Sequence, residues 1–168
     1  MFFDTFTTIH SLLSLAAIAT GVLAVAALFN IRLPQIFTIL FLLTAVGTSA
    51  TGFGFTFYGL KPSHVVGAIA LVILAVTIYA GYFTALTGSW RWIYAAGIVA
   101  SLYLLVFVGI AQSFAKIEVL RAAAPTQSEP PFAIAEAIGL VVFLIVGYLA
   151  ARAYRPEEPE LAGRSVNA

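Results

Sequence analysis

The chain alternates long apolar runs with short polar breaks, and its charged residues fall almost only in the breaks. Four stretches contain no Asp, Glu, Lys or Arg, namely residues 5–31, 33–60, 62–90 and 92–115. A helix that crosses a bilayer needs about 20 apolar residues, so each stretch is long enough for one crossing and too short for two. The runs are apolar on every side, as helices in lipid are, and they lack the alternation typical of β-barrel strands.

This pattern predicts an all-α integral membrane bundle of five transmembrane helices, at about residues 9–29, 34–55, 63–86, 90–114 and 131–152. The fifth run contains Glu136 and ends at Arg152, and the residues between these two are too few to cross a bilayer. We therefore expect the fifth helix to begin near Pro131. The segment before it is compatible with an ordinary connecting loop or with a short surface helix at residues 116–123.

Composition agrees with a single membrane domain. Apolar residue types make up 62% of the chain and charged residues only 9%, whereas soluble domains carry roughly 25% charged residues. Residues 1–154 are predicted to form one transmembrane bundle, and the Pro- and Glu-containing residues 155–168 a disordered, solvated tail. The lipid bilayer is thus the expected environment, and a net charge of +1 predicts no nucleic-acid partner. The chain has no Cys, which excludes disulfides and thiolate-ligated metals.

Five crossings place the two termini on opposite sides of the membrane. One side then holds three basic residues, Lys61, Lys116 and Arg121, and the other holds five, Arg32, Arg91, Arg152, Arg155 and Arg164. The positive-inside rule assigns the richer side to the cytoplasm. The expected orientation is an outer N-terminus and an inner C-terminus.

Four polar side chains are expected in the outer half of the bundle, given the direction in which each predicted helix crosses the membrane. His10 lies at the start of the first predicted helix, His64 at the start of the third, Gln112 near the end of the fourth and Glu136 early in the fifth. Each of these helix ends faces the same side of the membrane in a five-helix topology. If the chain has a binding site, we expect it in that half of the bundle.

Several interpretations of these residues remain open. His10 and His64 could hold a b-type haem or line a quinone pocket, with Gln112 and Glu136 nearby, or they could bind a metal ion with Glu136 as a third ligand. Alternatively, the two histidines anchor helix starts at the lipid headgroups. Glu136 is a candidate coupling residue of a small transporter, or a carboxylate near a helix start that headgroup water hydrates.

No catalytic motif is found. The chain has no Ser-His-Asp arrangement, no zinc-protease helix and no phosphate-binding loop, so we do not expect an enzyme. The favoured hypothesis is an accessory subunit that binds other membrane proteins or itself, as part of a larger membrane complex. The alternatives are an electron-transfer protein that uses His10 and His64, and a small transporter that uses Glu136.

Four sequence pieces taken together resemble a family of small polytopic inner-membrane proteins of proteobacteria with no assigned activity. The pieces are TGFGF (51–55), PSHVVG (62–67), SWRWIY (89–94) and APTQSEPPF (124–132). The resemblance covers nearly the whole chain and implies a bacterial inner-membrane location. A His followed by a stripe of small residues is also loosely similar to small haem-binding four-helix membrane proteins, although their several paired His ligands are missing here.

Overall fold

The structure is a computed structural model that describes residues 2–54 and 62–155. These residues form an all-helical bundle without strands. Its elements are α1 (Phe2–Ala27), α2 (Ile36–Gly52), α3 (Pro62–Phe83), α4 (Trp90–Lys116), α5 (Glu118–Ala123) and α6 (Pro130–Ala153). The prediction of an all-α bundle is confirmed. Nearly all of the predicted C-terminal tail lies outside the described residues.

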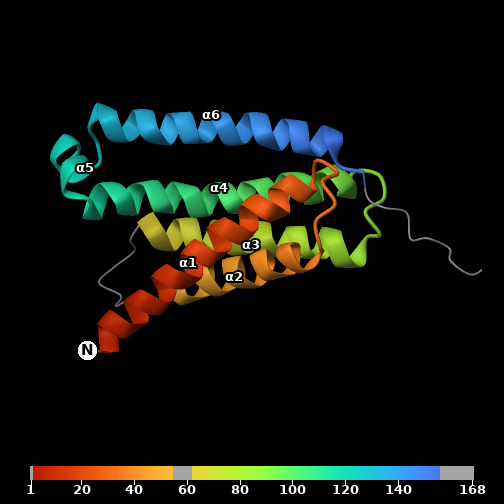
Figure 1. Ribbon diagram of the computed structural model, residues 1–168, viewed down its shortest axis with the longest axis horizontal. Helices are drawn as coiled ribbons and strands as arrows, with labels where there is room; N and C mark the ends of the chain where they lie inside the picture. Colours follow the sequence, from red (N-terminus) through yellow and green to blue (C-terminus); the bar gives the residue numbers. More distant parts are fainter. Residues whose placement is uncertain (1, 55–61, 156–168) are drawn as a thin grey trace, which may run out of the picture.

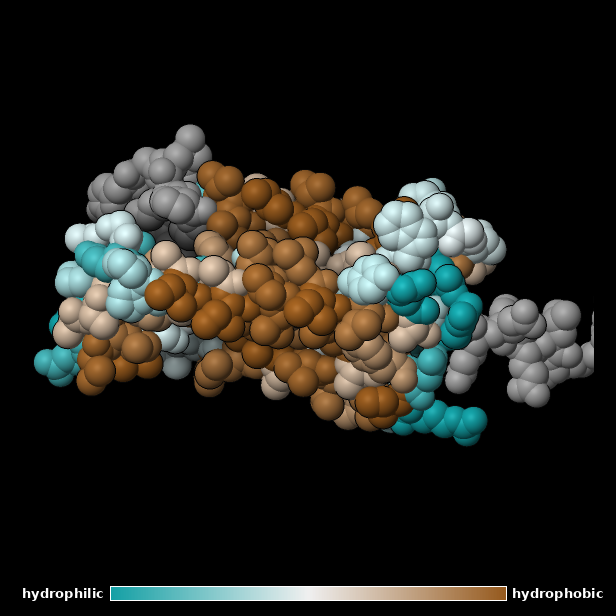
Figure 2. Space-filling model, turned by 90° about the horizontal axis from the view of Figure 1, so that it is seen from above, coloured by the Kyte–Doolittle hydropathy of each residue, from teal (hydrophilic) through white to brown (hydrophobic). Residues whose placement is uncertain are grey.

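Four helices are long and apolar enough to cross a membrane, as expected of a multi-pass membrane protein. The four spans are Thr5–Ala27, His64–Phe83, Trp90–Lys116 and Pro130–Ala153. Figure 2 shows an apolar belt over the middle of the molecule with hydrophilic groups gathered at both ends. The remaining helix, α2, is apolar but has 17 residues, or about 25 Å at 1.5 Å per residue, against a hydrocarbon core of about 30 Å.

The ends of α1 and α2 differ from the sequence expectation. Helix α1 begins at Phe2 and not near residue 9, because nothing between these positions breaks a helix. Helix α2 begins two residues later than expected, since the carbonyl of Pro34 accepts a turn bond from the amide of Phe37 at 3.1 Å. It also ends earlier, at Gly52, where Phe53 caps it.

The connection between α3 and α4 is also longer than expected. Helix α3 ends at Phe83, three residues before the predicted end. Ala85 and Leu86 adopt φ angles of 50° and 54°, and this left-handed conformation is incompatible with a right-handed helix. Helix α4 agrees closely with the prediction at its start, and Trp90 is its first residue.

The segment after α4 contains a short helix, so the expectation of a helix in this stretch is confirmed, and its location at a membrane surface stays a prediction. Ile117 is extended, with φ −85° and ψ 119°, and separates α4 from the six-residue α5. None of the residues of α5 is buried, and Val119 is 77% exposed. Such a short helix with exposed apolar residues suits the boundary between lipid and water.

Helix α4 lies at the centre of the bundle and contacts α1, α3, α5 and α6. Helix α1 crosses it obliquely, packs closely on α2, and starts well away from α6 (Figure 1). Gly21 makes this crossing close, because a Cβ there would lie 2.7 Å from Leu102 and 2.8 Å from Phe41. Phe41, Leu74 and Ile98 are at most 1% exposed and form the centre of the core.

Helix α6 packs chiefly against α4, along a face that carries small residues. A Cβ at Gly139 would lie 3.4 Å from Ile110, and one at Gly147 would lie 3.5 Å from Val99. The remaining surface of α6 is exposed, and Ala150 is its one buried residue. The helix therefore borders the bundle on one side only, as Figure 1 also shows.

Candidate functional site

Helices α1, α2, α3 and α4 line a partly open cavity of about 630 Å³ in the half of the bundle where α1 starts. Ligand pockets in proteins have volumes of about 300–1,000 Å³. The walls combine hydroxyl, imidazole and amide groups with apolar side chains. The polar lining residues are Thr7, His10, Ser11, Ser14, Thr48, Ser49, His64, Ser101, Gln112 and Lys116.

His10 reaches the cavity from α1 and is held in place by α2. Its Nδ1 lies 2.8 Å from Oγ1 of Thr51. The hydroxyl of Thr51 already donates to the carbonyl of Gly47 at 2.7 Å, so its oxygen accepts the proton from Nδ1 of His10. This hydrogen bond sets the tautomer and the orientation of the imidazole.

His64 enters the cavity from the start of α3. Its side chain is 6% exposed, and its ring centroid lies 5.7 Å from that of Phe53 at the end of α2. The absence of a side chain at Gly67 lets Phe53 approach α3, since a Cβ there would lie 3.3 Å from the aromatic ring. Both histidines therefore border one cavity, which their expected position at the same end of the bundle had left open.

Two hydroxyls in the cavity wall, those of Thr48 and Ser101, are buried without a hydrogen-bond partner in the described part of the chain. Thr48 is 8% exposed and Ser101 2% exposed. Hydroxyls inside helices commonly donate to a carbonyl one turn earlier. Several helical hydroxyls of this bundle do so, for example those of Ser14, Thr44, Thr51, Thr77 and Ser113. Thr48 and Ser101 are exceptions, and both lie in the same cavity.

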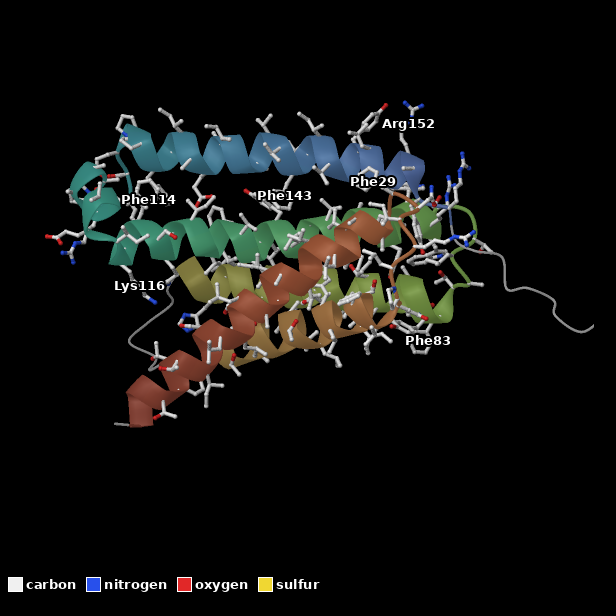
Figure 3. The ribbon with its side chains drawn as sticks, viewed as in Figure 1. Phe29, Phe83, Phe114, Lys116, Phe143 and Arg152 are labelled. Atoms are coloured by element: carbon white, nitrogen blue, oxygen red, sulfur yellow. The ribbon has the colours of Figure 1, made fainter. Side chains whose placement is uncertain are left out.

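Gln112 and Lys116 lie at the mouth of the cavity, on the last turns of α4. Both side chains are exposed. Lys116 leaves α4 on the side that faces away from α6 (Figure 3), and it lines the same cavity as His10. The lining residues that the structure describes include no Asp or Glu, so the charged and donor groups at the mouth favour a ligand that accepts hydrogen bonds.

Glu136 does not belong to this cavity. It lies on α6, and its two carboxylate oxygens are buried without a hydrogen-bond partner among the described residues. The expectation that Glu136 joins His10 and His64 around one metal ion is wrong, because the described residues contain no group of three His, Cys, Asp or Glu able to hold one. Glu136 is also not among the lining residues of the cavity, and the transport hypothesis stays a prediction.

The sequence indicated part of this site. Thr48, Ser101 and Gln112 can be placed by helical spacing on faces of their helices that also carry polar or small residues. The role of Lys116 at the mouth was missed, although its position one turn after Gln112 is a signal that could have found it. The lack of partners at Thr48 and Ser101 depends on side-chain packing and had no signal in the sequence.

No family model, no curated protein and no solved structure matches this chain.

Proposed function

We propose that the protein is a bacterial inner-membrane protein that binds a small amphipathic molecule in the cavity between α1 and α4. The observation that carries this proposal is the pair of unpartnered hydroxyls of Thr48 and Ser101 in the cavity wall. A buried polar group without a partner costs about 1–3 kcal/mol. A ligand with a hydrogen-bonding group would remove this cost at both positions, while its apolar part contacts the aliphatic walls.

The membrane topology proposed with this function has five crossings, an outer N-terminus and an inner C-terminus. Helix α1 ends at one end of the bundle and α3 starts at the other (Figure 1), which supports a crossing by the segment between them. Helix α2 makes this crossing despite its 17 residues, with local thinning of the bilayer or with help from the flanking residues.

Because the chain has no Cys, single cysteines report this topology cleanly. In spheroplasts, we expect a membrane-impermeant maleimide to label Glu118→Cys and to label Thr87→Cys only after lysis. Both positions are exposed. Labelling of both positions from the same side would contradict the odd number of crossings, and the reverse pattern would contradict the orientation.

Mass spectrometry of bound molecules tests the binding function itself. The protein is purified in a mild detergent, and its bound small molecules are extracted and identified. We expect the double variant Thr48→Val/Ser101→Ala to lose a molecule that the wild-type protein retains. The matched control is Thr44→Val/Ser113→Ala, which removes hydroxyls of α2 and α4 that donate to their own helices. Equal retention by both double variants, or no bound molecule in any sample, would contradict the proposal.

A bound haem is a variant of the same proposal. It is supported by the position of both histidines on one cavity and by the bond from Nδ1 of His10 to Thr51, since ligating imidazoles commonly use the second nitrogen in this way. Absorbance spectra decide it. A Soret band that is lost in His10→Ala and in His64→Ala would support haem, and a colourless protein after expression with haem supplied would exclude it.

A second candidate function is that of an accessory subunit in a larger membrane complex, docked through α6. It is supported by Glu136, whose carboxylate oxygens are buried on α6 without a partner in the described part of the chain. Intramembrane carboxylates commonly pair with another group. If a cationic partner supplies this group, Glu136→Gln should lose a subunit that co-purifies with the wild-type protein. The same subunit recovered with both proteins would contradict docking at Glu136.

A further inference from the structure

We infer that the ligand of the cavity is an acidic amphiphile whose anionic head binds at Lys116 and whose chain carries an oxygen that reaches the buried hydroxyls. This inference rests on the proposed function, and it assigns the chemical class of the ligand. It follows from the order of groups along the cavity, from the mouth to the deep end.

The described residues at the mouth offer positive charge and hydrogen-bond donors. Lys116 supplies an ammonium group, and Gln112 an amide, on neighbouring turns of α4. The His10 ring lines the same cavity. Since no carboxylate lines the cavity among the side chains that the structure describes, an anionic head meets no repulsion from them, whereas a cationic head would meet Lys116.

The cavity is elongated and becomes apolar away from the mouth. Its lining on α4 runs from Lys116 to Ser101, a distance of about 22 Å at 1.5 Å per residue. Aliphatic side chains line the deeper part, including Ile18, Leu74, Leu104 and Leu105. This shape suits an extended hydrocarbon chain, whose burial is favourable by about 0.8 kcal/mol for each CH₂ group.

A plain hydrocarbon chain would not satisfy the two hydroxyls. Among the α4 residues that line the cavity, Ser101 lies farthest from the mouth. Thr48 lies on α2, one turn before Gly52, and both of these residues line the cavity. Both hydroxyls are buried without partners in the described structure. A hydroxyl, carbonyl or ester oxygen along the ligand chain would pair with them. The cavity thus distinguishes an oxygenated chain from a plain one.

Competition binding with defined amphiphiles tests this inference. The full-length protein is reconstituted in phosphatidylcholine nanodiscs and titrated with ricinoleic acid, which carries both a carboxylate and a chain hydroxyl. Oleic acid lacks the hydroxyl, and methyl ricinoleate lacks the acid. We expect each of these two to bind about tenfold more weakly than ricinoleic acid, as for the loss of one hydrogen bond to a charged or buried group. Oleoyl lysophosphatidic acid tests whether a phosphate head replaces the carboxylate.

Matched variants assign the effects to residues. Lys116→Met should remove the preference for the acid over the methyl ester. Arg121→Met is the control, since this exposed cation of α5 lies near the same end of the bundle and outside the cavity lining. Thr48→Val/Ser101→Ala should remove the preference for ricinoleic over oleic acid and keep the preference for the acid head.

The outcomes separate the inference from the function on which it rests. If the methyl ester binds as tightly as the acid and Lys116→Met has no effect, the acidic head is overturned and the binding function stands. If oleic acid binds as tightly as ricinoleic acid, the chain oxygen is overturned. If none of the amphiphiles binds and no molecule co-purifies with the wild-type protein, the proposed function itself fails.

Discussion

The imidazole of His10 on α1 and the hydroxyl of Thr51 on α2 are joined by a hydrogen bond of 2.8 Å. This bond connects two helices at the end of the bundle where α1 starts (Figure 1) and where both residues lie near the cavity. Because Thr51 accepts the proton while it donates to its own helix, the bond fixes a wall of the cavity as well as a side-chain tautomer.

Thr51→Val should loosen this wall at a modest cost in stability. Interhelical hydrogen bonds in membranes average about 0.6 kcal/mol and reach about 1.7 kcal/mol. We expect unfolding in a denaturing detergent to shift by about 1 kcal/mol. Thr44→Val is the control, since the Thr44 hydroxyl bonds only within α2. Equal shifts for the two variants would show that the bond to His10 contributes nothing.

Ser101→Ala and Ser113→Ala should have opposite effects on the ligand-free protein. The hydroxyl of Ser101 is buried without a partner in the described structure, so its removal should stabilise the empty bundle by about 1 kcal/mol. Ser113 donates to the carbonyl of Gly109 at 2.8 Å, so its removal should be neutral or slightly destabilising. Thermal unfolding of delipidated samples measures both. A loss of stability in Ser101→Ala would indicate a partner within the chain.

Gly97→Ala should separate α3 from α4. A Cβ at Gly97 would collide with the side chain of Thr77, which is fully buried. Overpacking of this kind typically costs about 1–3 kcal/mol. Gly147→Ala is the control, because its Cβ would meet Val99 at an ordinary contact distance of 3.5 Å. Unfolding measurements should find Gly97→Ala the less stable variant, and Thr77→Ala should partly restore it.

The loop before α6 should loosen in acid. Desolvation acts to raise the pKa of Glu129. Hydrogen bonds from the hydroxyl of Thr126 and from the amides of Thr126 and Ser128 outweigh this effect, so the pKa of Glu129 lies below its usual value. A carboxyl group whose pKa is lower in the folded state stabilises the fold at pH values above its pKa in the unfolded state. This stabilisation is lost as the pH falls through the pKa of the folded state.

Amide hydrogen exchange measures this loop directly. Protection of the amides of Thr126 and Ser128 should fall as the carboxylate of Glu129 is protonated, and Glu129→Gln should weaken it at neutral pH. Glu118→Gln on α5 is the control. Protection that does not change with pH would mean that the carboxylate does not hold the loop.

The sequence predicted the helices well because sparse charges and unbroken apolar runs leave few alternatives. It failed at helix ends that depend on backbone detail, such as the left-handed conformations of Ala85 and Leu86. Helix direction was enough to bring His10, His64 and Gln112 to the same end of the bundle. Whether they surround one cavity depends on the rotation of each helix about its axis, which side-chain packing determines.

Glu136 illustrates this limit. Its depth in the bundle followed from the sequence, and the small residues Gly139 and Gly147 correctly indicated that its face packs on a neighbour. The neighbour is α4, on the side away from the cavity. Glu136 is separated from the two histidines because α6 packs on the other side of α4. The spacing of residues in the sequence does not indicate on which side α6 packs.

Photo-crosslinking with a diazirine-bearing acidic amphiphile tests the central claim, that a small amphipathic molecule occupies the cavity between α1 and α4. Labelled peptides are mapped in the full-length protein in nanodiscs. We expect saturable labelling of cavity residues such as Leu104, Leu105 and Val108, and we expect unlabelled ricinoleic acid to suppress it. Labelling confined to exposed α6 residues such as Val141 and Leu144, unsaturable and insensitive to competitor, would contradict it.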